Sequence, residues 1–499
     1  MNTRMKAARV RFAPSPTGST HLGSARTALY NYLLAKQTGG QFVLRIEDTD
    51  QKRYVPGAES ELMEGLLWLG LEWDEGPEKG GPYSPYRQSE RKEIYIKHAQ
   101  ELVARGCAFY CFCTPERLKN MRKEQLMNKE PVRYDGTCRQ LSAQEVENRL
   151  FTGEPHVIRY RMPQEGTITV IDRLRGEITF ENRNLDDSIL VKSDGLALYH
   201  LAAMVDDHLM GVTHVIRSAE WLSTFGLHAH IIRTFGWDEP EWIHLSIFLK
   251  PSGKGKMSKR ETSHLMEDGY SIFLNDLKNL GYIPEGIINW IALMGWSYDD
   301  HLEYFTLTDL ISKFSLDRCN PAPAAINFSK LDHFNGMHIR NLEVNDLATR
   351  LIPFFESAGY DVDKDTLTSI TPLIQERMIT LEDGPEKAGF FFKDEVDPVP
   401  EELVGKKMTP IESASAARDA YEVLSDLPMI NFDTAEAPLR ELAETLDLKA
   451  GQLFGIIRVA VTGQKVSPPL FESMEIIGRE KVLERIGNAI NLLDNLAES

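Results

Sequence analysis

The 499-residue chain has few cysteines, no long apolar run and no low-complexity tract. Five cysteines are too few for a disulfide framework, and four of them crowd between residues 107 and 138, which indicates either a metal site or no shared role. The longest apolar runs stop well short of the ~20 residues that a membrane-spanning helix needs. The basic segment 1–10 has no apolar core behind it, unlike a secretory signal. We therefore expect a cytoplasmic protein with no membrane partner.

Composition and charge narrow the class further. Apolar residues make up 42% of the chain and charged residues 26%, which is typical of folded globular proteins. At ~150 residues per domain the length predicts about three domains. The net charge of −18 argues against a charge-driven DNA-binding protein, so no DNA partner is expected. A locally basic face remains compatible with this total.

The first fifty residues predict a strand, a helix and a second strand. Residues 7–13 alternate in polarity, and the segment 14–18 is a turn of small residues and prolines. Apolar residues then recur at helical spacing from Leu22 to the Gly39-Gly40 stop, and 42–46 is again strand-like. Parallel strands joined by one helix place the connecting turn at the carboxyl edge of the sheet. Its small residues would let backbone N–H groups approach a nucleotide phosphate.

Two common nucleotide motifs are absent. Gly18 and Gly23 have the spacing of a P-loop, but Ser24 follows where that loop needs a lysine. No Gly-x-Gly-x-x-Gly fingerprint is present, which disfavours a nicotinamide enzyme. A glycine-rich loop at 251–260 carries four lysines and arginines. Alone it reads as a solvated basic loop, whereas together with the turn at 14–23 it indicates a loop that closes on an anion.

Two segments carry a family resemblance. Pro14-Ser15-Pro16-Thr17-Gly18-Ser19-Thr20-His21-Leu22-Gly23-Ser24 and Lys256-Met257-Ser258-Lys259-Arg260 resemble the HIGH and KMSKS signatures of class I aminoacyl-tRNA synthetases. Three further segments narrow the resemblance to the bacterial glutamyl members of the glutamyl/glutaminyl branch: Arg45-Ile46-Glu47-Asp48-Thr49-Asp50, Tyr199-His200-Leu201 and Asp206-Asp207-His208-Leu209-Met210-Gly211. The motifs occur in the same order along nearly the whole chain.

The resemblance implies an α/β Rossmann-type catalytic domain with an inserted connective domain, followed by an all-α C-terminal anticodon-binding region. The implied boundaries are 1–106 and 189–250 for the two halves of the catalytic domain, 107–188 for the inserted acceptor-end-binding domain, 251–340 for the KMSKS loop and stem-contact domain, and 341–499 for the helical region, with a break near 400. The residues themselves support the last part, because β patterns are nearly absent after Val344. Leu470, Met474, Ile477, Val482, Ile486, Ile490 and Leu493 form an apolar helical stripe. Glutaminyl relatives end in β-barrels, so a helical tail favours the glutamyl type.

The implied activity joins L-glutamate to ATP, supplied with Mg²⁺, and then passes the glutamyl group to tRNA(Glu). Such enzymes are usually monomers. The resemblance assigns ATP binding to Thr17, Gly18, His21, Gly23, Lys256, Ser258 and Lys259, with His21, Lys256 and Lys259 as the catalytic residues. It assigns glutamate binding to Arg11, Ser15, Glu47, Tyr199 and Arg217.

The glutamate pocket must satisfy one ammonium and two carboxylates. Glu47 corresponds to the residue that holds the α-ammonium, whereas Arg11, Tyr199 and Arg217 correspond to those around the side-chain carboxylate. A guanidinium matches a carboxylate in shape and charge, and Arg217 would select glutamate over glutamine. The alternative is a surface arginine that follows a predicted strand at 212–216.

Three positions depart from the family pattern. Ser24 replaces the second histidine of the HIGH signature and Arg260 replaces the final serine of KMSKS, and both changes are common in the glutamyl branch. Ala203 stands where relatives often have asparagine, so one hydrogen bond of the substrate pocket is expected to be missing or mediated by water.

The cysteines and one arginine leave alternatives open. Cys111, Cys113 and Cys138 match a Cys-x-Cys…Cys-x-His zinc pattern, but Gln140 occupies the histidine position. A zinc site would need another ligand, such as His156 or water, and a vestigial site without metal is the preferred interpretation. Arg377 falls where an arginine of relatives reads the third anticodon base, and an ordinary surface arginine is the alternative.

The insertion and the competing functions complete the hypothesis. Basic residues dominate part of the insertion and suit phosphate contacts to the tRNA acceptor end, although a solvated helix face at 115–129 explains them as well. Adenylyl-transferring enzymes of small-molecule metabolism, a shortened paralogue that modifies a tRNA base, and a non-enzymatic tRNA-binding protein are the other classes. The chain length and helical tail disfavour the first two, and the intact motif residues disfavour the third.

Overall fold

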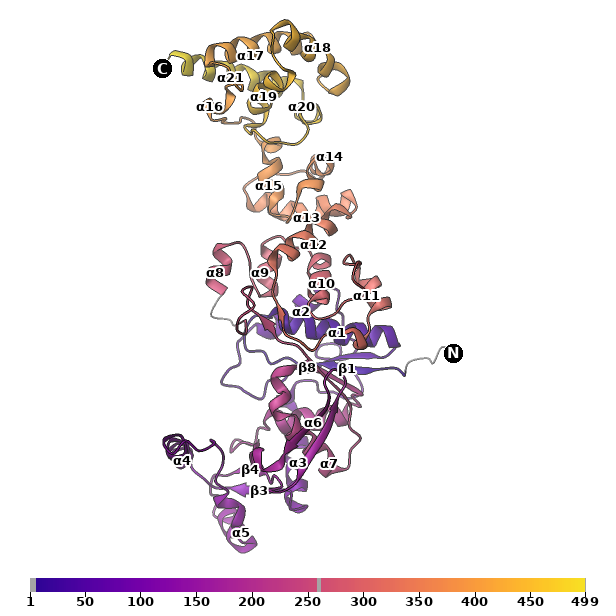
Figure 1. The fold of residues 1–499 in the computed structure, drawn as a ribbon, viewed down its shortest axis with the longest axis vertical. Coiled ribbons are helices and arrows are strands. Elements are labelled where there is room, and N and C mark those ends of the chain that lie inside the picture. Colours follow the sequence, from indigo (N-terminus) through magenta and orange to yellow (C-terminus); the bar gives the residue numbers. More distant parts are fainter. Residues whose placement is uncertain (1–5, 258–261, 499) are drawn as a thin grey trace. The chain divides into compact units, whose positions relative to one another are not determined.

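The computed structural model describes residues 6–257 and 262–498 (Figure 1). It comprises two compact units, which we call the sheet unit and the helical unit. The sheet unit contains residues 1–277 and 287–328, and the helical unit contains residues 278–286 and 329–499. Within the described ranges, no helix is both long and apolar enough to cross a membrane.

The predicted strand, helix and strand at the N-terminus are confirmed. Strand β1 (Arg9–Phe12) pairs in parallel with β2 (Gln41–Leu44), and helix α1 (Leu22–Thr38) connects them. Helix α1 ends where Gly39 adopts a left-handed conformation with φ of 66°. Strand β2 ends two residues earlier than the pattern indicates. The N–H of Arg45 still donates to the carbonyl of Phe12 in β1 (3.0 Å), whereas that of Ile46 donates to the loop carbonyl of Tyr86 (2.9 Å).

Six strands form the main sheet in the described part of the chain, in the order β2-β1-β8-β9-β5-β6. Strands β1, β2, β5, β8 and β9 run parallel, and β6 is an antiparallel edge strand. A second, antiparallel sheet has the order β3-β4-β7, and a short pair joins β10 to β11. The remaining strands are β3 (Ala108–Cys111), β4 (Val157–Tyr160), β5 (Thr167–Asp172), β6 (Gly176–Glu181), β7 (Ile189–Val191), β8 (His214–Ser218), β9 (Glu241–Leu245), β10 (Phe248–Leu249) and β11 (Ala324–Ala325).

Two strand positions matter for the site. The strand expected at 212–216 is β8 at His214–Ser218, so Arg217 lies inside a strand and not after one. The segment 107–188, expected as one insertion, is shared between the two sheets: β3 and β4 belong to the smaller sheet, and β5 and β6 extend the main one. Strand β5 alternates exposed and buried residues, which places Asp172 on the buried face at its carboxyl end.

Helices cover the main sheet on both faces (Figure 1). Helix α1 packs on β1, β2 and β8, and α7 packs on β5 and α6. The helices after α1 are α2 (Ala58–Trp68), α3 (Lys92–Ala104), α4 (Pro115–Met127), α5 (Ala143–Phe151), α6 (Tyr199–Leu209), α7 (Phe225–Phe235), α8 (Thr262–Glu267), α9 (Leu274–Asn279), α10 (Pro284–Leu293), α11 (Leu307–Lys313), α12 (Phe328–Arg340), α13 (Val344–Ser357), α14 (Lys364–Ile374), α15 (Asp383–Ala388), α16 (Pro400–Leu403), α17 (Pro410–Ser425), α18 (Phe432–Thr445), α19 (Ala450–Thr462), α20 (Leu470–Ile477) and α21 (Arg479–Glu498).

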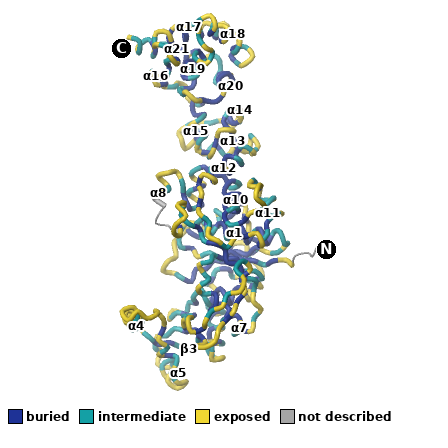
Figure 2. Tube along the Cα trace, viewed as in Figure 1, coloured by how far each residue is buried: buried dark blue, intermediate teal, exposed yellow. Residues whose placement is uncertain are grey.

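Burial follows these layers (Figure 2). The core of the sheet unit includes Val215 of β8, Trp242 of β9 and Phe225 of α7. Helices α4 and α5 contribute no buried residue and stand out as exposed segments in Figure 2. The predicted helix at 115–129 is thus confirmed as α4, Pro115–Met127. Its residues are exposed or partly buried, and none is buried.

The predicted all-α C-terminal region is also confirmed. No strand occurs in residues 344–498, all of which the structure describes. One apolar cluster of the helical unit lies mainly within residues 339–391, and another within residues 403–493. The predicted stripe is real: Leu470, Met474, Val482, Ile486 and Leu493 are buried. Its other two members, at 477 and 490, are partly buried against the same cluster.

Candidate active site

The turn after β1 lies at the carboxyl edge of the main sheet. The N–H of Glu47 donates to the carbonyl of Pro14 (2.9 Å), and the N–H of Thr17 donates to the carbonyl of Ser15 (2.9 Å). Gly18 has a φ of 125°, a conformation that residues with a side chain rarely adopt. Ser15 is exposed, whereas Thr17 and Gly18 are partly buried. The turn is therefore a fixed backbone shape that leads into α1.

His21 caps the N-terminus of α1. Its Nδ1 accepts a hydrogen bond from the N–H of Gly23 (2.9 Å), so the neutral ring carries its proton on Nε2. The ring packs edge-on against Phe273, with 6.1 Å between the ring centroids. A side chain at Gly23 would meet only the His21 ring within 4 Å, which leaves the helix start accessible. The N–H groups of Leu22, Gly23 and Ser24 already donate to the Ile272 carbonyl, His21 Nδ1 and the His21 carbonyl. The helix start therefore favours a phosphate through the positive end of the helix dipole and not through free N–H groups.

Lys256 lies at the end of the glycine-rich loop, where the chain turns back toward Phe248. The amide of Met257 donates to the carbonyl of Phe248 (3.0 Å), and Lys250 donates to Gly255 (3.1 Å). The Lys256 side chain is 54% exposed, and its Nζ lies 2.6 Å from Glu220 Oε1. An exposed pair of this kind is weak, so an incoming anion can compete for the lysine. Ser258, Lys259 and Arg260 lie outside the described residues.

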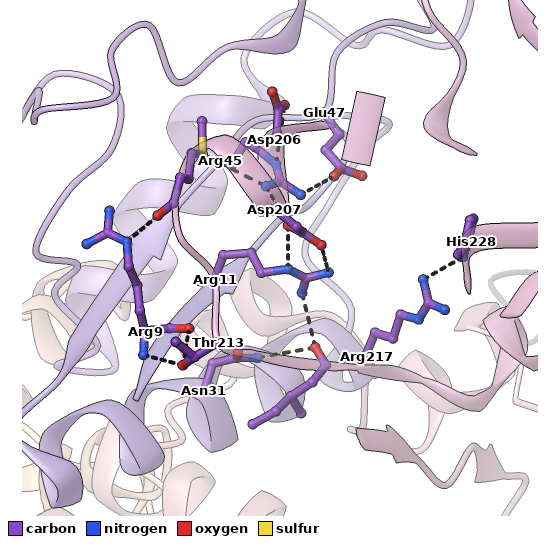
Figure 3. A network of polar contacts seen from close by, with 12 residues as sticks. Arg9, Arg11, Asn31, Arg45, Glu47, Asp206, Asp207, Thr213, Arg217 and His228 are labelled. Carbon is purple, nitrogen blue, oxygen red and sulfur yellow. Dashed lines mark hydrogen bonds and ion pairs between the residues drawn. The ribbon is translucent and has the colours of Figure 1, made fainter. Parts of the chain in front are cut away.

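Two buried arginines share one acid next to the turn (Figure 3). Arg11 donates to Asp207 through Nε (3.0 Å) and Nη2 (3.3 Å), and its Nη1 lies 3.4 Å from the carbonyl oxygen of Ile216. Arg45 contacts the same Asp207 (2.7 Å) and also Glu47 (3.0 Å). Although burial favours the neutral acid, Arg11 and Arg45 hold the pKa of Asp207 below its ordinary value. Asp207 therefore fixes both guanidinium groups.

Asp206 and Asp207 belong to one of the motifs that carry the family resemblance, but sequence reasoning assigned them no role. The structure places them on α6, with Asp206 accepting hydrogen bonds from Gln88, Arg91 and Tyr95. Two consecutive aspartates in one motif were the available signal. Buried aspartates need partners, so such a pair indicates nearby cations or hydrogen-bond donors.

Glu47 titrates near neutrality. Burial raises its pKa to about 7, and the charges of Arg45 and Arg11 only partly oppose this effect. A carboxyl group with such a pKa gains its charge in the physiological pH range. It is thus suited to receive a cation, since an ammonium group would stabilise the ionised form that burial disfavours.

Arg217 is buried and retains an unused donor. It is 4% exposed, so the interpretation as a surface arginine is wrong. Nη1 donates to the Tyr199 hydroxyl (3.2 Å) and to His228 Nδ1 (3.0 Å), and Nε donates to His244 Nε2 (2.9 Å). Nη2 is buried and has no hydrogen-bond partner among residues 6–257 and 262–498. A buried orphan donor on a cation favours an anionic acceptor from a ligand.

The neighbours of Arg217 shape the pocket. The Tyr199 ring stacks on Trp221, with 4.0 Å between centroids. Ala203 lies one helical turn after Tyr199 and is fully buried in the core of the sheet unit. His228 and His244 were missed by sequence reasoning, since neither lies near Arg217 in a recognisable motif.

The three cysteines of the predicted pattern come together. Their Sγ atoms all lie within 4.8 Å of one another, and those of Cys113 and Cys138 are 3.5 Å apart. The structure adds Tyr134, whose hydroxyl lies 3.5 Å from the sulfurs of Cys111 and Cys113. Sequence reasoning missed Tyr134, because tyrosine is an uncommon metal ligand.

His156 does not complete this group. The cluster of described residues with metal-ligand geometry contains the three cysteines alone. His156 Nδ1 lies 3.0 Å from the carbonyl oxygen of Glu154, and its ring packs against Tyr110 and Phe112. The expected ligand is thus held elsewhere by its own aromatic neighbours.

Arg377 lies in a 3₁₀ turn of the helical unit, Gln375–Arg377, and is exposed. Its Nη1 donates to the carbonyl of Ser467 (2.8 Å). Arg458 donates to the Ser467 hydroxyl (2.6 Å), so two cations lie together there.

Comparisons with known proteins agree along the whole chain. A model described as the class I tRNA synthetase (E and Q) catalytic domain matches residues 7–333, and an anticodon binding domain model matches residues 346–490. A Dehalococcoides mccartyi protein named "Glutamate--tRNA ligase" is 45% identical over 495 residues, covering 98% of this chain and 99% of that protein. A Borreliella afzelii protein of the same name is 43% identical, with 96% and 97% covered.

Solved structures agree with this result. The crystal structure of a glutamate tRNA ligase from Elizabethkingia meningosepticum in complex with its amino acid has a TM-score of 0.88 to this chain. The two are 36% identical in sequence, and the match covers 97% of this chain and 99% of the other. With both family models and full-length relatives in agreement, the chain belongs to the class I tRNA synthetases of the glutamate and glutamine (E and Q) family.

Proposed function

We propose that this chain is a glutamate–tRNA ligase that forms glutamyl-adenylate from L-glutamate and ATP and then transfers the glutamyl group to tRNA(Glu). One observation carries the amino-acid choice: the buried Arg217 pairs with no acid among the described residues and keeps Nη2 without a partner. The full-length relatives named "Glutamate--tRNA ligase" support the same assignment.

In the first step, an α-carboxylate oxygen of glutamate attacks the α-phosphorus of Mg²⁺-bound ATP, and pyrophosphate leaves. Negative charge grows on the phosphate oxygens, so positioned donors lower the barrier. The turn at Thr17 and Gly18 and the start of α1 would hold the phosphates, with Gly23 leaving room beside His21. His21 would donate from Nε2, and Lys256 would leave Glu220 for the phosphates, with Lys259 and Ser258 acting from the same loop.

The glutamate substrate would lie between Glu47 and Arg217. Glu47 would receive the α-ammonium, and Arg217 with Tyr199 would bind the side-chain carboxylate. Ser15 would contact the substrate from the turn. Arg11 already makes two hydrogen bonds to Asp207. We therefore propose that Arg11 acts on the substrate through its positive charge and not through a direct contact.

The test is ATP–pyrophosphate exchange with glutamate or glutamine, each with and without tRNA. We expect exchange with glutamate that requires tRNA, and charging of tRNA(Glu). Exchange with glutamate alone would indicate a tRNA-independent adenylate-forming enzyme. Exchange with glutamine would contradict the role of Arg217, and tRNA binding without any exchange would indicate a non-catalytic protein.

The pKa of Glu47 predicts a pH dependence of glutamate binding. With a pKa of about 7, Glu47 is mainly neutral at pH 6 and mainly ionised at pH 8. Only the ionised form pairs with an ammonium, so KM for glutamate should rise roughly tenfold from pH 8 to pH 6. The Glu47→Gln variant should show a higher KM that no longer follows this curve. Equal wild-type KM values at both pH values would exclude the proposed role.

We propose that tRNA contacts both units. The helical unit matches an anticodon binding domain model, and Arg377 is our candidate for anticodon contact. In the insertion, some basic residues are already engaged: Arg139 pairs with the buried Asp187 (2.7 Å), and Arg117 pairs with Asp135. The exposed lysines of α4 are therefore better candidates for phosphate contacts at the acceptor end.

We propose that the cysteine cluster binds one Zn²⁺ ion, as a structural group within the insertion. With Zn–S distances of ~2.3 Å, tetrahedral thiolates lie ~3.8 Å apart. The sulfurs of Cys111, Cys113 and Cys138 all lie within 4.8 Å of one another, and a water or the Tyr134 oxygen, 3.5 Å from two of the sulfurs, would be the fourth donor. The residues thus fit the ion without a histidine at position 140.

Metal analysis tests this site directly. We expect about one zinc per chain in protein purified without chelators, and a loss of the metal in Cys113→Ser. Cys107→Ser is the matched control, because Cys107 lies outside the cluster. Wild-type protein without zinc would indicate a vestigial site.

A further inference from the structure

Arg217 differs from the other buried arginines of the site in what holds it. Arg11 and Arg45 both contact Asp207, so each has an acidic partner within the protein. Arg217 has no carboxylate within ion-pair distance in the described chain, and its Cζ lies 4.9 Å from the centre of the Trp242 ring. A buried cation without an acid is costly, so its position needs another explanation.

His244 holds Arg217 from the neighbouring strand. The two residues are register partners in the parallel pair of β8 and β9. Arg217 Nε can only donate, so His244 Nε2 accepts (2.9 Å) and the ring proton lies on Nδ1. That proton points to Asp172 Oδ2, 2.7 Å away. The carboxylate therefore selects the one ring form that can accept from Arg217.

Asp172 is itself fixed in place. Its Oδ2 also accepts from the backbone N–H of His244 (3.0 Å), and Oδ1 accepts from the N–H groups of Leu174 and Arg175. It is 1% exposed at the carboxyl end of β5. Three adjacent strands thus contribute one residue each to a single line of hydrogen bonds.

His228 of α7 and His200 of α6 extend this line of hydrogen bonds on the other side of Arg217. His228 Nδ1 accepts from Arg217 Nη1 (3.0 Å), which leaves the proton of the neutral ring on Nε2. That nitrogen lies 3.0 Å from His200 Nδ1, which accepts the proton. Figure 3 shows the contact between Arg217 and His228.

All three imidazoles are neutral at working pH. Burial lowers the pKa of His244 to about 4, against the opposing effect of Asp172. Burial and the charge of Arg217 lower the pKa of His200 to about 4 and that of His228 well below its ordinary value. The groups that hold Arg217 therefore add no charge next to it.

We propose that His244 and His228 are positioning residues that clamp Arg217 with neutral acceptors, so that its charge stays available for the side-chain carboxylate of the amino acid. Asp172 sets the ring form of His244, and His200 orients His228. The inference rests on the proposed function and deepens it. It assigns glutamate selection to the clamp as well as to the arginine.

Two pairs of variants test the clamp. Asparagine at 228 keeps an acceptor near the Nδ1 position, and glutamine at 244 keeps one near the Nε2 position, whereas leucine keeps neither. We expect His228→Leu and His244→Leu to raise KM for glutamate roughly tenfold or more, as for loss of a hydrogen bond to a charged group. We expect His228→Asn and His244→Gln to stay within about threefold of wild type. KM for ATP should change little in all four.

His230→Asn is the matched control. It makes the same change on helix α7, but His230 contacts Asn182 and not Arg217. Aminoacylation of tRNA(Glu) is measured at pH 8, where Glu47 is ionised, and thermal unfolding identifies variants that fail to fold. Folded leucine variants with unchanged KM for glutamate would overturn the clamp, as would equal losses for ATP and glutamate.

Asp172→Asn tests the ring form separately. An amide N–H of the new asparagine would face His244 Nδ1, which favours the ring form with its proton on Nε2. That proton would then face the N–H of Arg217 Nε, so the hydrogen bond between them would be lost. In protein labelled with ¹⁵N at histidine, we expect the protonated nitrogen of His244 to change from Nδ1 to Nε2. An unchanged ring form would remove Asp172 from the clamp. A wild-type protein that does not charge tRNA(Glu) would instead refute the proposed function itself.

Discussion

Replacing Arg217 with alanine is expected to reduce kcat/KM for glutamate by about 100-fold or more, with little change in KM for ATP. The substrate carboxylate would be buried without its cation, and breaking a buried ion pair costs roughly 3–5 kcal/mol. Aminoacylation of tRNA(Glu) over a range of glutamate concentrations measures the change. The protein itself should remain folded, because the acceptors around Arg217, on Tyr199, His228 and His244, are neutral and leave no charge unpaired.

Arg233→Ala is the control for this variant. Arg233 lies near the end of α7, is exposed and pairs with Glu239 at the surface. Its removal should leave the kinetics unchanged. If Arg217→Ala keeps wild-type kinetics with glutamate, the side-chain carboxylate is bound elsewhere and the assignment fails.

Replacing Arg45 with methionine is expected to destabilise the sheet unit by about 3–5 kcal/mol. Arg45 is fully buried and contacts Glu47, Asp207 and, at 3.8 Å, Asp206. Its loss leaves buried carboxylates facing one another without their shared cation. Thermal unfolding should show a midpoint lower by several degrees, and the activity should fall as well.

Arg53→Met provides the comparison. Arg53 pairs with Asp50, but its side chain is 72% exposed, so the change should cost about 0.5 kcal/mol or less. Raising the salt concentration should not rescue the Arg45 variant, because buried charges are poorly screened. Equal midpoints for the Arg45 variant and the wild type would show that the acids are neutralised by other groups.

Local patterns predicted the parts of the site that local structure builds. The alternation before Pro14 and the spacing after Leu22 predicted β1 and α1, and these two elements place His21 at the helix N-terminus. The Cys-x-Cys pattern likewise predicted which sulfurs meet. In each case the residues are close in sequence or joined by one short motif.

Long-range contacts were beyond that reasoning. The partners of Arg217 come from β9, α6 and α7, and that of His244 comes from β5, so no spacing connects them. The same holds for Tyr134, which reaches the cysteines through the fold of the insertion. Arg11 is a mixed case. Sequence reasoning identified it as a site residue but did not predict its partner, Asp207.

The register pairing of Arg217 with His244 has a consequence for the redesign of specificity. A variant that accepts an uncharged amino acid cannot be reached by changing Arg217 alone, because the acceptors on Tyr199, His228 and His244 would lose their donor in the same step. Substitutions at 228 and 244 must accompany the one at 217, because an intermediate that lacks only the arginine binds neither substrate well. Directed evolution that varies single positions would therefore stall at this point, whereas a library that varies all three at once can cross it.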